Sequence, residues 1–488
     1  MNAIPVRNPR TGAHDFEIVP PSAGDLDATI AEMRRAQRGW WAAGIEARID
    51  VMQAWKEAFV AAKQEIINAL TTDTGRRLLS ISEVNGTPLS IDRWCGMAQG
   101  LLKGDSGRSE AVPHIRYETQ DVPYPLVAVI SPWNFPLLLS LIDTLPALLA
   151  GSAVLVKPSE VTPRFMAPLM RTIEAVPLLH SVLRFVPGAG ETGAALIDRS
   201  DCVCFTGSVK TGRRVAEQAA RNFIPAFLEL GGKDPLIVLR TADLDAAADA
   251  AMRGGAANSG QACQAIERVY VDAEIFEPFV ERLTARAEAA KFNYPDINQG
   301  TIGPLIFDKQ ADIIQRHLMD ARTKGATIRT GGRIHDLDGG KWCEPTVLTD
   351  VTQDMLVIQE ETFGPVLPVM AFRTVDEAIA LANDTVFGLS AGVIAGTAEE
   401  AMDVGRHIDA GAISINDASL TAIFREAEKN SFGLSGMGSS RMGPTALKRF
   451  MRRKLFIVNT DKPMALDALD EKNAASITVV GRAGVSKN

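Results

Sequence analysis

A single cysteine in a turn of small residues is the strongest chemical signal in this sequence. Cys263 ends the run Gly260-Gln261-Ala262-Cys263, and about thirty residues upstream Glu229 begins the run Glu229-Leu230-Gly231-Gly232-Lys233. A thiolate must reach its substrate unobstructed, so such a turn suits a nucleophile, and a carboxylate on a second glycine-bearing turn suits a general base. A free cysteine taken alone is more often a small buried core residue. The remaining motifs decide between these two interpretations.

An amide on a rigid turn is the next candidate. The segment Pro132-Trp133-Asn134-Phe135-Pro136 comes directly after the apolar run Pro125–Ile130. Its two prolines restrict the backbone, so the Asn134 amide could act as a preorganised donor to an oxyanion. The alternative is an ordinary Asx turn.

Two polar turns could hold a dinucleotide. The segment 205–212 (Phe-Thr-Gly-Ser-Val-Lys-Thr-Gly) follows a predicted strand and opens a helix, so its N–H groups and the Ser208 hydroxyl could face a pyrophosphate. The alternative for Ser208 is a simple helix N-cap. Glu160, in the segment 157–160 (Lys-Pro-Ser-Glu), could accept hydrogen bonds from a ribose, or could be a solvated loop charge. The run Gly188–Gly193 matches G-x-G-x-x-G but lacks the expected acid about twenty residues later.

The elements that must position these residues alternate between strand and helix. The first hundred residues read as helical, with helices expected over 25–41 and 47–70. From 122 onward the pattern predicts a doubly wound α/β domain, then a second α/β set with a seam near Gly231-Gly232. The first set of predicted strands is 125–130, 153–156, 184–186, 201–205 and 235–239, and the second is 268–271, 366–369, 391–394 and 412–415. The predicted helices between them are 137–149, 163–175, 190–198, 209–220, 275–291, 309–324 and 375–383.

Composition limits the classes of function. A chain of 488 residues needs more than one core, and a net charge of −8 argues against a nucleic acid or an anionic membrane as partner. Five cysteines fit a reducing compartment, and Cys202-Val203-Cys204 does not match zinc spacing, so we expect no metal. The N-terminus shows no secretory signal, and no unbroken apolar run reaches about eighteen residues. We therefore expect a cytoplasmic protein without a membrane span.

Six motifs in order resemble the aldehyde dehydrogenase superfamily, specifically its NAD(P)-dependent, hydrolytic and non-acylating members. They are the Asn134 turn, the Lys157 turn, the Ser208 turn, the Glu229 run, the Cys263 turn and the segment 361–366 (Glu-Thr-Phe-Gly-Pro-Val). The similarity extends from the first helices to about Phe456. The resemblance implies oxidation of an aldehyde through a cysteine thiohemiacetal and a thioester, with hydride passing to NAD and water then hydrolysing the thioester.

The resemblance also implies a role for individual residues. Cys263 would be the nucleophile, Asn134 with the Cys263 N–H the oxyanion hole, and Glu229 the base that activates water. NAD would be preferred because the Glu160 carboxylate repels a 2′-phosphate, although Lys157 could compensate and allow NADP. The implied cofactor-binding residues are Trp133, Lys157, Ser159, Glu160, Gly207, Ser208, Gly212, Leu230, Gly231, Glu361 and Phe363.

The substrate side departs from the family pattern. Ile142-Asp143 stands where many members have an aromatic residue and a lysine, which puts a proton relay through that lysine in doubt. The segment Ser431–Gly438 looks shortened. Apolar residues suggest a tunnel for an aromatic or medium-chain aliphatic aldehyde, although they could simply belong to the core. The candidate pocket residues are Phe135, Leu138, Leu139, Ile142, Ala262, Gln264, Ile423 and Phe432.

The resemblance further implies a division into domains and an oligomer. We expect a NAD-binding domain over 1–110 and 124–231, a catalytic domain over 232–440, an oligomerisation arm over 111–123 and 441–465, and a tail over 466–488. Lys454–Val458 has few local partners and would pair between subunits of a homodimer or homotetramer. Two other functions stay open. One is a coenzyme A-acylating aldehyde dehydrogenase, which Glu229 argues against, and the other is a non-catalytic NAD-binding structural protein.

Overall fold

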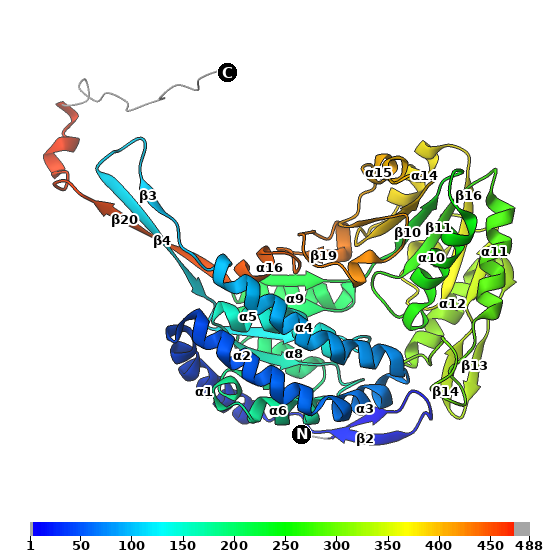
Figure 1. Cartoon of the computed structure of the whole chain (residues 1–488), viewed down its shortest axis with the longest axis horizontal. Coiled ribbons are helices and arrows are strands. Elements are labelled where there is room, and N and C mark those ends of the chain that lie inside the picture. The colour runs from blue at the N-terminus through cyan, green and yellow to red at the C-terminus, as the bar shows by residue number, and fades with distance from the viewer. Residues whose placement is uncertain (1–2, 473–488) are drawn as a thin grey trace.

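The computed structural model describes residues 3–472 and consists of two α/β lobes and a thin arm (Figure 1). The first lobe contains a six-stranded sheet, the second a seven-stranded sheet, and the arm a three-stranded sheet. This architecture confirms the predicted α/β fold with a doubly wound sheet, a second α/β sheet and a small β arm. None of the helices within residues 3–472 combines the length and the apolar character that a membrane crossing needs.

Helices cover the beginning of the chain, after a short hairpin that the sequence did not predict. The predicted helix 25–41 is confirmed as α1, but the single helix predicted over 47–70 is wrong, because the chain breaks at Ala62. The break gives α2 and α3 different directions, and Trp55 of α2 and Leu70 of α3 are both fully buried in the core of the first lobe. The elements of this region are β1 Ile4–Arg7, β2 His14–Ile18, α1 Ala23–Ala42, α2 Gly44–Ala61, α3 Lys63–Thr74 and α4 Arg77–Leu101.

The sheet of the first lobe has the strand order β19-β9-β8-β5-β6-β7. The chain runs from the central strand β5 outward to β7 and then returns through β8 to the other side, so the topological switch point lies between β5 and β8. All neighbours are parallel except β19, which is antiparallel to β9. The strands are β5 Leu126–Ile130, β6 Ala153–Lys157, β7 Leu183–Phe185, β8 Cys202–Thr206, β9 Ala226–Glu229 and β19 Gly436–Met437. The helices are α5 Pro136–Ala150, α6 Met166–Glu174, α7 Pro177–His180, α8 Gly190–Ile197 and α9 Val209–Arg221.

The sheet of the second lobe has the order β12-β15-β16-β11-β10-β17-β18. The strand predicted over 235–239 exists as β10 but lies in this sheet, so its assignment to the first set of strands is wrong. The place next to β8 in the first sheet is taken by β9, which the sequence did not predict. The strands are β10 Asp234–Val238, β11 Ile266–Asp272, β12 Thr327–Thr330, β15 Thr346–Thr349, β16 Val366–Phe372, β17 Ala391–Ile394 and β18 Ile413–Ile415. Helices and a side hairpin complete the lobe: α10 Leu244–Ala256, α11 Phe276–Ala289, α12 Lys309–Thr323, α13 Leu356–Gln359, α14 Val375–Asn383, α15 Ala398–Gly405, β13 Ile334–Leu337 and β14 Gly340–Cys343.

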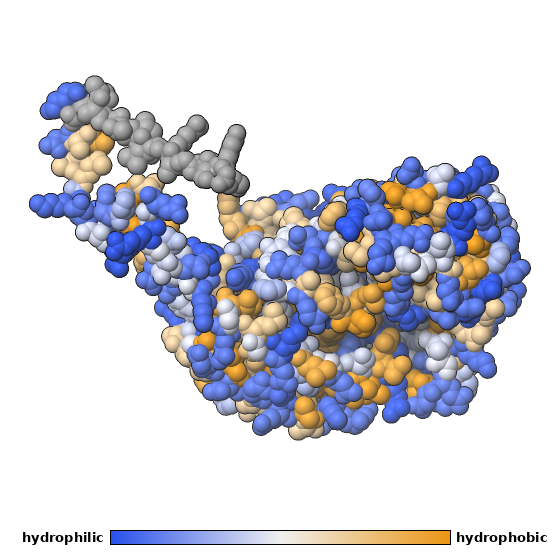
Figure 2. Space-filling view, turned by 45° about the horizontal axis from the view of Figure 1, so that its top comes forward, coloured by the Kyte–Doolittle hydropathy of each residue, from blue (hydrophilic) through white to orange (hydrophobic). Residues whose placement is uncertain are grey.

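The arm joins segments from opposite ends of the chain. β20 (Met451–Asn459) pairs antiparallel with β4 (Ile115–Pro123) along its whole length, and β3 (Ser106–Arg108) pairs with the other side of β4. The strand near Lys454–Val458, for which few local partners were predicted, pairs with β4 from the other end of the chain. Figure 2 shows that the arm stands clear of the body. The predicted tail begins with the turn Leu466–Leu469, and its part from 473 onward lies outside the described residues.

Candidate functional site

The turns singled out in the sequence meet where the two lobes join. Asn134 Nδ2, from the turn after β5, donates to the carbonyl of Gln261, two residues before Cys263, at 3.1 Å. Gly232 follows β9, and a Cβ on this residue would lie 2.4 Å from the carbonyl oxygen of Cys263. The same Gly232 donates its N–H to Glu361 Oε1 at 3.0 Å. Segments from both sheets thus converge around the cysteine.

The turn that carries Cys263 has an unusual backbone. Asn258, Ser259 and Gly260 have positive φ angles of 54°, 57° and 72°. A Cβ at Gly260 would lie 2.2–2.3 Å from the carbonyl group of Gly364, so only glycine fits there. Gln261 is buried, and its side chain hydrogen-bonds with Asn258, Pro304 and Ile306. The turn is therefore rigid, and Cys263 at its end is only half-buried.

Acidic neighbours keep the thiol of Cys263 protonated. Burial raises the pKa of Cys263 to about 12, and the carboxylates of Glu361, Glu229 and Asp234 add to the increase, while Lys429 opposes it. Burial likewise raises the pKa of Glu361 to about 8, with a contribution from Glu267. The free protein at neutral pH therefore holds a resting thiol.

Alkylation of Cys263 should therefore depend steeply on pH. Because the thiolate is the reactive form, we expect the rate of modification by iodoacetamide to rise about tenfold per pH unit between pH 7 and pH 10, without a plateau. Peptide mass spectrometry at each pH would separate Cys263 from the buried cysteines, such as Cys343. A plateau near pH 9 would contradict the raised pKa.

A buried ion pair that the sequence did not predict holds Asn134 in place. Arg76 Nη2 donates to the carbonyl of Asn134 at 2.5 Å, lies 3.0 Å from Glu83 Oε1, and its guanidinium covers the ring of Phe135 at 4.4 Å. Glu83 Oε2 accepts hydrogen bonds from the N–H groups of Leu137 and Leu138 at the beginning of α5. The sequence signal that could have revealed this ion pair is the spacing of Arg76 and Glu83, two charged residues seven positions apart on an otherwise buried helix face. Since Asn134 uses one amide hydrogen for Gln261, its second hydrogen can serve a ligand.

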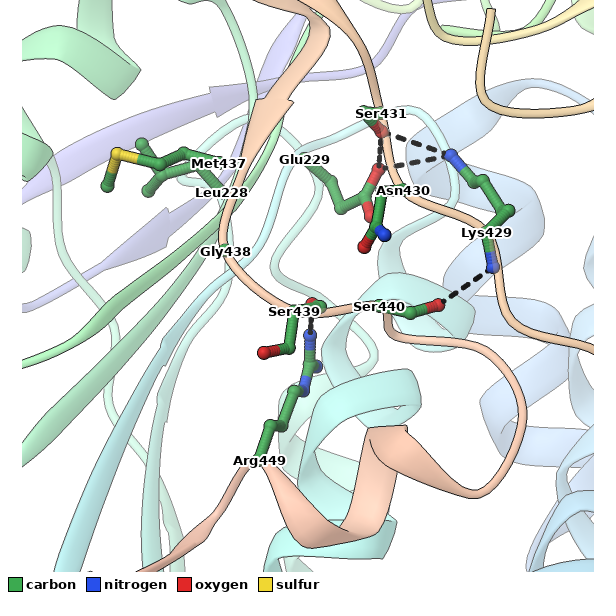
Figure 3. Close-up of a pocket in the computed structure, with 10 residues that line it drawn as sticks. All are labelled: Leu228, Glu229, Lys429, Asn430, Ser431, Met437, Gly438, Ser439, Ser440 and Arg449. Atoms are coloured by element: carbon green, nitrogen blue, oxygen red, sulfur yellow. Dashed lines mark hydrogen bonds and ion pairs between the residues drawn. The ribbon is translucent and has the colours of Figure 1, made fainter. Parts of the chain in front are cut away.

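Glu229 lies at the end of β9 with two partners that the sequence also did not predict. Its Oε2 accepts a hydrogen bond from Ser431 Oγ at 3.1 Å and lies 3.6 Å from Lys429 Nζ. Figure 3 shows the three side chains pointing toward one another beside a small polar cavity, which Arg449 also lines. Ser431 begins the segment Ser431–Gly438, which the sequence marked only as departing from the family pattern, and Lys429 lies two residues before it.

Asp143 is buried between two arginines from the C-terminal part of the chain. Arg441 Nη2 lies 2.6 Å from Asp143 Oδ2, and Arg449 makes an ion pair with Oδ1. Arg441 also donates to Thr206 Oγ1 at 2.7 Å, at the end of β8. Burial alone would raise the pKa of Asp143, but the two arginines outweigh it and hold the pKa below its usual value. The residue that replaces the family lysine thus joins α5 to the C-terminal segment.

Most of the predicted cofactor residues lie at or just after the carboxyl ends of β5, β6, β8 and β9, beside the switch point, whereas Glu361 and Phe363 precede β16 of the second sheet. Lys157 Nζ lies 3.2 Å from Glu160 Oε2; the lysine is buried and the glutamate carboxylate is partly exposed. Next to them, the Ser159 hydroxyl accepts the Val161 N–H. Ser208 is the N-cap of α9 and accepts a hydrogen bond from the Thr211 N–H. This geometry supports the simple N-cap and leaves a nucleotide role open.

Glycines bring the remaining cofactor candidates into close contact. A Cβ would lie 2.6 Å from the Phe205 ring at Gly207, 2.5 Å from Leu230 at Gly212 and 2.7 Å from the Glu361 carboxylate at Gly231. The Trp133 and Phe363 rings meet edge to face with centroids 5.4 Å apart. These close approaches pack the beginning of α9 against the turn after β9, and that turn against Glu361.

The predicted substrate residues fall into two groups. Phe135, Leu138, Leu139 and Ile142 share one face of α5 and its entry turn and are only half-buried, whereas Leu137 and Leu141 on the other side are buried. This favours a pocket lining over a core role for that face. On the other side of the site, Ala262 and Gln264 flank Cys263, Ser419 donates to the Gln264 carbonyl at 2.9 Å, Ile423 is 79% exposed, and Phe432 lies against Gly388.

Fold and site together define an α/β enzyme with a doubly wound sheet of the kind that binds nucleotides and a cysteine at the junction of its two lobes. The sequence model of the Aldehyde dehydrogenase family matches residues 1–456, and the chain therefore belongs to this family. The prediction of an NAD(P)-dependent aldehyde dehydrogenase is confirmed at the level of the family.

Individual relatives cover nearly the whole chain. PutA of Anabaena variabilis is 52% identical with a TM-score of 0.93, over 95% of this chain and 99% of that chain. Betaine aldehyde dehydrogenase of Staphylococcus aureus, solved with NAD+, is 30% identical with a TM-score of 0.89, over 96% of both chains. A Mycolicibacterium smegmatis protein, provisionally named succinate-semialdehyde dehydrogenase [NADP(+)], is 33% identical over 95% of this chain and 90% of its own length. These relatives differ in named substrate and cofactor.

Proposed function

We propose that this protein oxidises an aldehyde to the carboxylic acid with NAD or NADP, through a covalent intermediate on Cys263. The observation that carries the proposal is the convergence of three groups. Asn134 hydrogen-bonds to the turn of Cys263, and the cysteine is only half-buried. Glu229 ends β9 three residues before Gly232, which packs against the Cys263 carbonyl. A nucleophile, an oxyanion donor and a base are the parts that acyl chemistry on cysteine needs.

Each step assigns one task to a side chain. Cys263, a thiol at rest, first loses its proton to water. The thiolate then attacks the aldehyde carbon and forms a C–S bond, and the second amide hydrogen of Asn134 stabilises the oxyanion. NAD(P) supplies the acceptor for the hydride that leaves the thiohemiacetal carbon, so that a thioester remains. Glu229 then takes a proton from water as the water oxygen attacks the thioester carbon. The C–S bond breaks, the sulfur leaves as thiolate and the acid is released.

The residues at the switch point would hold the cofactor. Glu160 and Lys157 would bind the adenosine ribose, Ser208 and Gly207 the pyrophosphate, and Glu361 and Phe363 the nicotinamide end. The ion pair between Lys157 and Glu160 partly neutralises the charge that would repel a 2′-phosphate, so NADP is compatible with the site although NAD is preferred. Trp133, Ser159, Gly212, Leu230 and Gly231 would shape the same groove.

The half-buried apolar face of α5 favours an aromatic or medium-chain aldehyde as substrate. Apolar side chains that are neither buried nor fully exposed commonly line small-molecule pockets.

The division into domains given above is part of the same proposal. The edge strand β20, with Leu455 54% and Ile457 67% exposed, would pair or pack in a homodimer or homotetramer. The free state of all five cysteines fits the cytoplasm.

An aldehyde panel tests the proposal. Benzaldehyde, hexanal, octanal and succinic semialdehyde would be incubated with NAD or NADP, without coenzyme A, and reduced cofactor and free acid would be measured. We expect equal amounts of both products, with the apolar aldehydes preferred. Turnover only in the presence of coenzyme A would instead indicate an acylating enzyme, and cofactor binding without any reduction would indicate a non-catalytic protein.

A further inference from the structure

A lysine from the C-terminal segment faces the proposed base at the junction of the lobes. Lys429 Nζ donates to Ser431 Oγ at 3.1 Å, and Ser431 Oγ donates to Glu229 Oε2, also at 3.1 Å. Lys429 Nζ itself lies 3.6 Å from that oxygen, and the side chains of Lys429 and Glu229 are only 11% and 15% exposed. Away from bulk water, such a polarised chain is stronger than the same contacts on a surface.

The segment that carries Lys429 is fixed relative to Glu229. Lys429 donates its N–H to Ser440 Oγ at 3.2 Å, as Figure 3 shows. In β19, Gly436 pairs with Glu229, and a Cβ on this glycine would lie 2.8 Å from Ser431. This close packing of β19 against β9 fixes the position of Ser431 relative to the Glu229 carboxylate. The contact is thus built into the sheet, unlike a mobile surface ion pair.

The other charged groups around Glu229 are either paired with another residue or carry a negative charge themselves. Arg441 acts on Glu229 through space, but its guanidinium binds Asp143 and Thr206. Arg449 lines the same cavity and also binds Asp143. On the remaining side lies Cys263, whose thiolate would repel the carboxylate. Lys429 is therefore the cation that pairs with Glu229 within residues 3–472.

We propose that Lys429 is the positioning residue of the base and, through Ser431, holds Glu229 as an oriented carboxylate. This inference rests on the proposed function, in which Glu229 accepts the proton of the water that attacks the thioester. Proton transfer needs a carboxylate oxygen aimed at the water, and the hydrogen bond from Ser431 with the ammonium of Lys429 beside it fixes where that oxygen points. The positive charge beside Glu229 therefore comes from Lys429 in the C-terminal part of the chain. On α5, where many relatives have a lysine, this chain has Asp143.

Substitution of Lys429 should slow hydrolysis of the thioester and leave the steps before it largely intact. In Lys429→Met we expect steady-state turnover to fall about tenfold, because the base is no longer held in place. Acyl-enzyme should then accumulate on Cys263, as measured by intact mass spectrometry during turnover, while the NAD(P)H of the first turnover still forms. Ser431→Ala should cause a smaller loss of the same kind.

Two variants serve as controls. Lys429→Arg keeps the cation and should restore most of the wild-type rate of thioester hydrolysis. Lys448→Met removes a lysine that is exposed on α16 (Thr445–Lys448) in the same C-terminal segment and should behave as wild type. Thermal unfolding of each variant would show that the fold is kept.

The outcomes separate this inference from the proposed function. Suppose the wild type forms NAD(P)H and free acid, but Lys429→Met and Ser431→Ala leave steady-state turnover unchanged and no acyl-enzyme accumulates. The inference is then wrong and the proposed function stands. Equal loss of the first turnover and of hydrolysis in folded Lys429→Met would also overturn it, because a general structural role would explain the result. A wild type that forms no NAD(P)H overturns both.

Discussion

Replacing Cys263 with alanine is expected to lower the rate of NAD(P)H formation by about 10⁴-fold or more. The half-buried sulfur at the end of a rigid turn is the atom that would bond to the aldehyde, and no other thiol can take its place, because the other four cysteines are buried. Cofactor affinity should change by less than about threefold, since the proposed cofactor residues lie on other turns.

The measurement is single-turnover and steady-state NAD(P)H formation with the preferred aldehyde, alongside cofactor titration. Cys95→Ala is the matched control, because Cys95 is buried on α4 in the core of the first lobe and should change activity little. Retention of more than a tenth of wild-type turnover in Cys263→Ala would rule out covalent catalysis at this position.

The central strands of the first sheet could be predicted from the sequence because they are buried on both faces. β5, β6 and β8 are apolar runs in which every residue is buried, and their predicted bounds differ from the observed ones by a single residue. β9 was missed because it is short, alternates between buried and half-buried residues, and ends in Glu229. β10 was placed in the wrong sheet because neighbours in a sheet are set by long-range packing, which a local pattern does not contain.

The residues of the candidate site also divide into those that the sequence could predict and those that it could not. Asn134, Glu229 and Cys263 were found because turn residues at defined spacing carry a local signal. Arg76 was not found, because its contact with Asn134 spans 58 residues of sequence, and neither was Ser431, which lies 202 residues from Glu229. Residues that position a catalytic group come from whichever element packs beside it, and the tertiary structure determines which element that is.

Asp143→Asn is the variant for which the largest loss of stability is expected, about 3–5 kcal/mol in the free energy of unfolding of the first lobe. The substitution keeps the shape of the side chain but removes the charge that compensates two buried arginines, of which Arg441 is 9% and Arg449 1% exposed. Within residues 3–472, the Nε atoms of both arginines already have no hydrogen-bond partner. Two guanidinium groups without an anion in a buried site are costly.

The dependence on pH gives a second measurement. The two arginines lower the pKa of Asp143 in the folded protein, so its contribution to stability is fully present above the pKa of an unfolded aspartate, about 3.9, and is lost as the pH falls through the lower folded value. The difference between Asp143→Asn and wild type should therefore be constant from about pH 5 to pH 8 and shrink below about pH 4.

Matched variants show whether uncompensated charge is the cause. Asp92→Asn removes the same charge from an exposed pair with Lys56 and should cost at most about 0.5 kcal/mol. Replacing Asp143, Arg441 and Arg449 together with Leu, Met and Met should recover much of the stability that Asp143→Asn loses, because apolar groups of similar size leave no buried charge behind. The triple variant should still lose activity, since Arg449 Nη1 binds the carbonyl of Ser439, next to the residue that anchors Lys429. If Asp143→Asn and Asp92→Asn instead unfolded at the same denaturant concentration, the cluster would hold neither α5 nor the segment that positions Glu229.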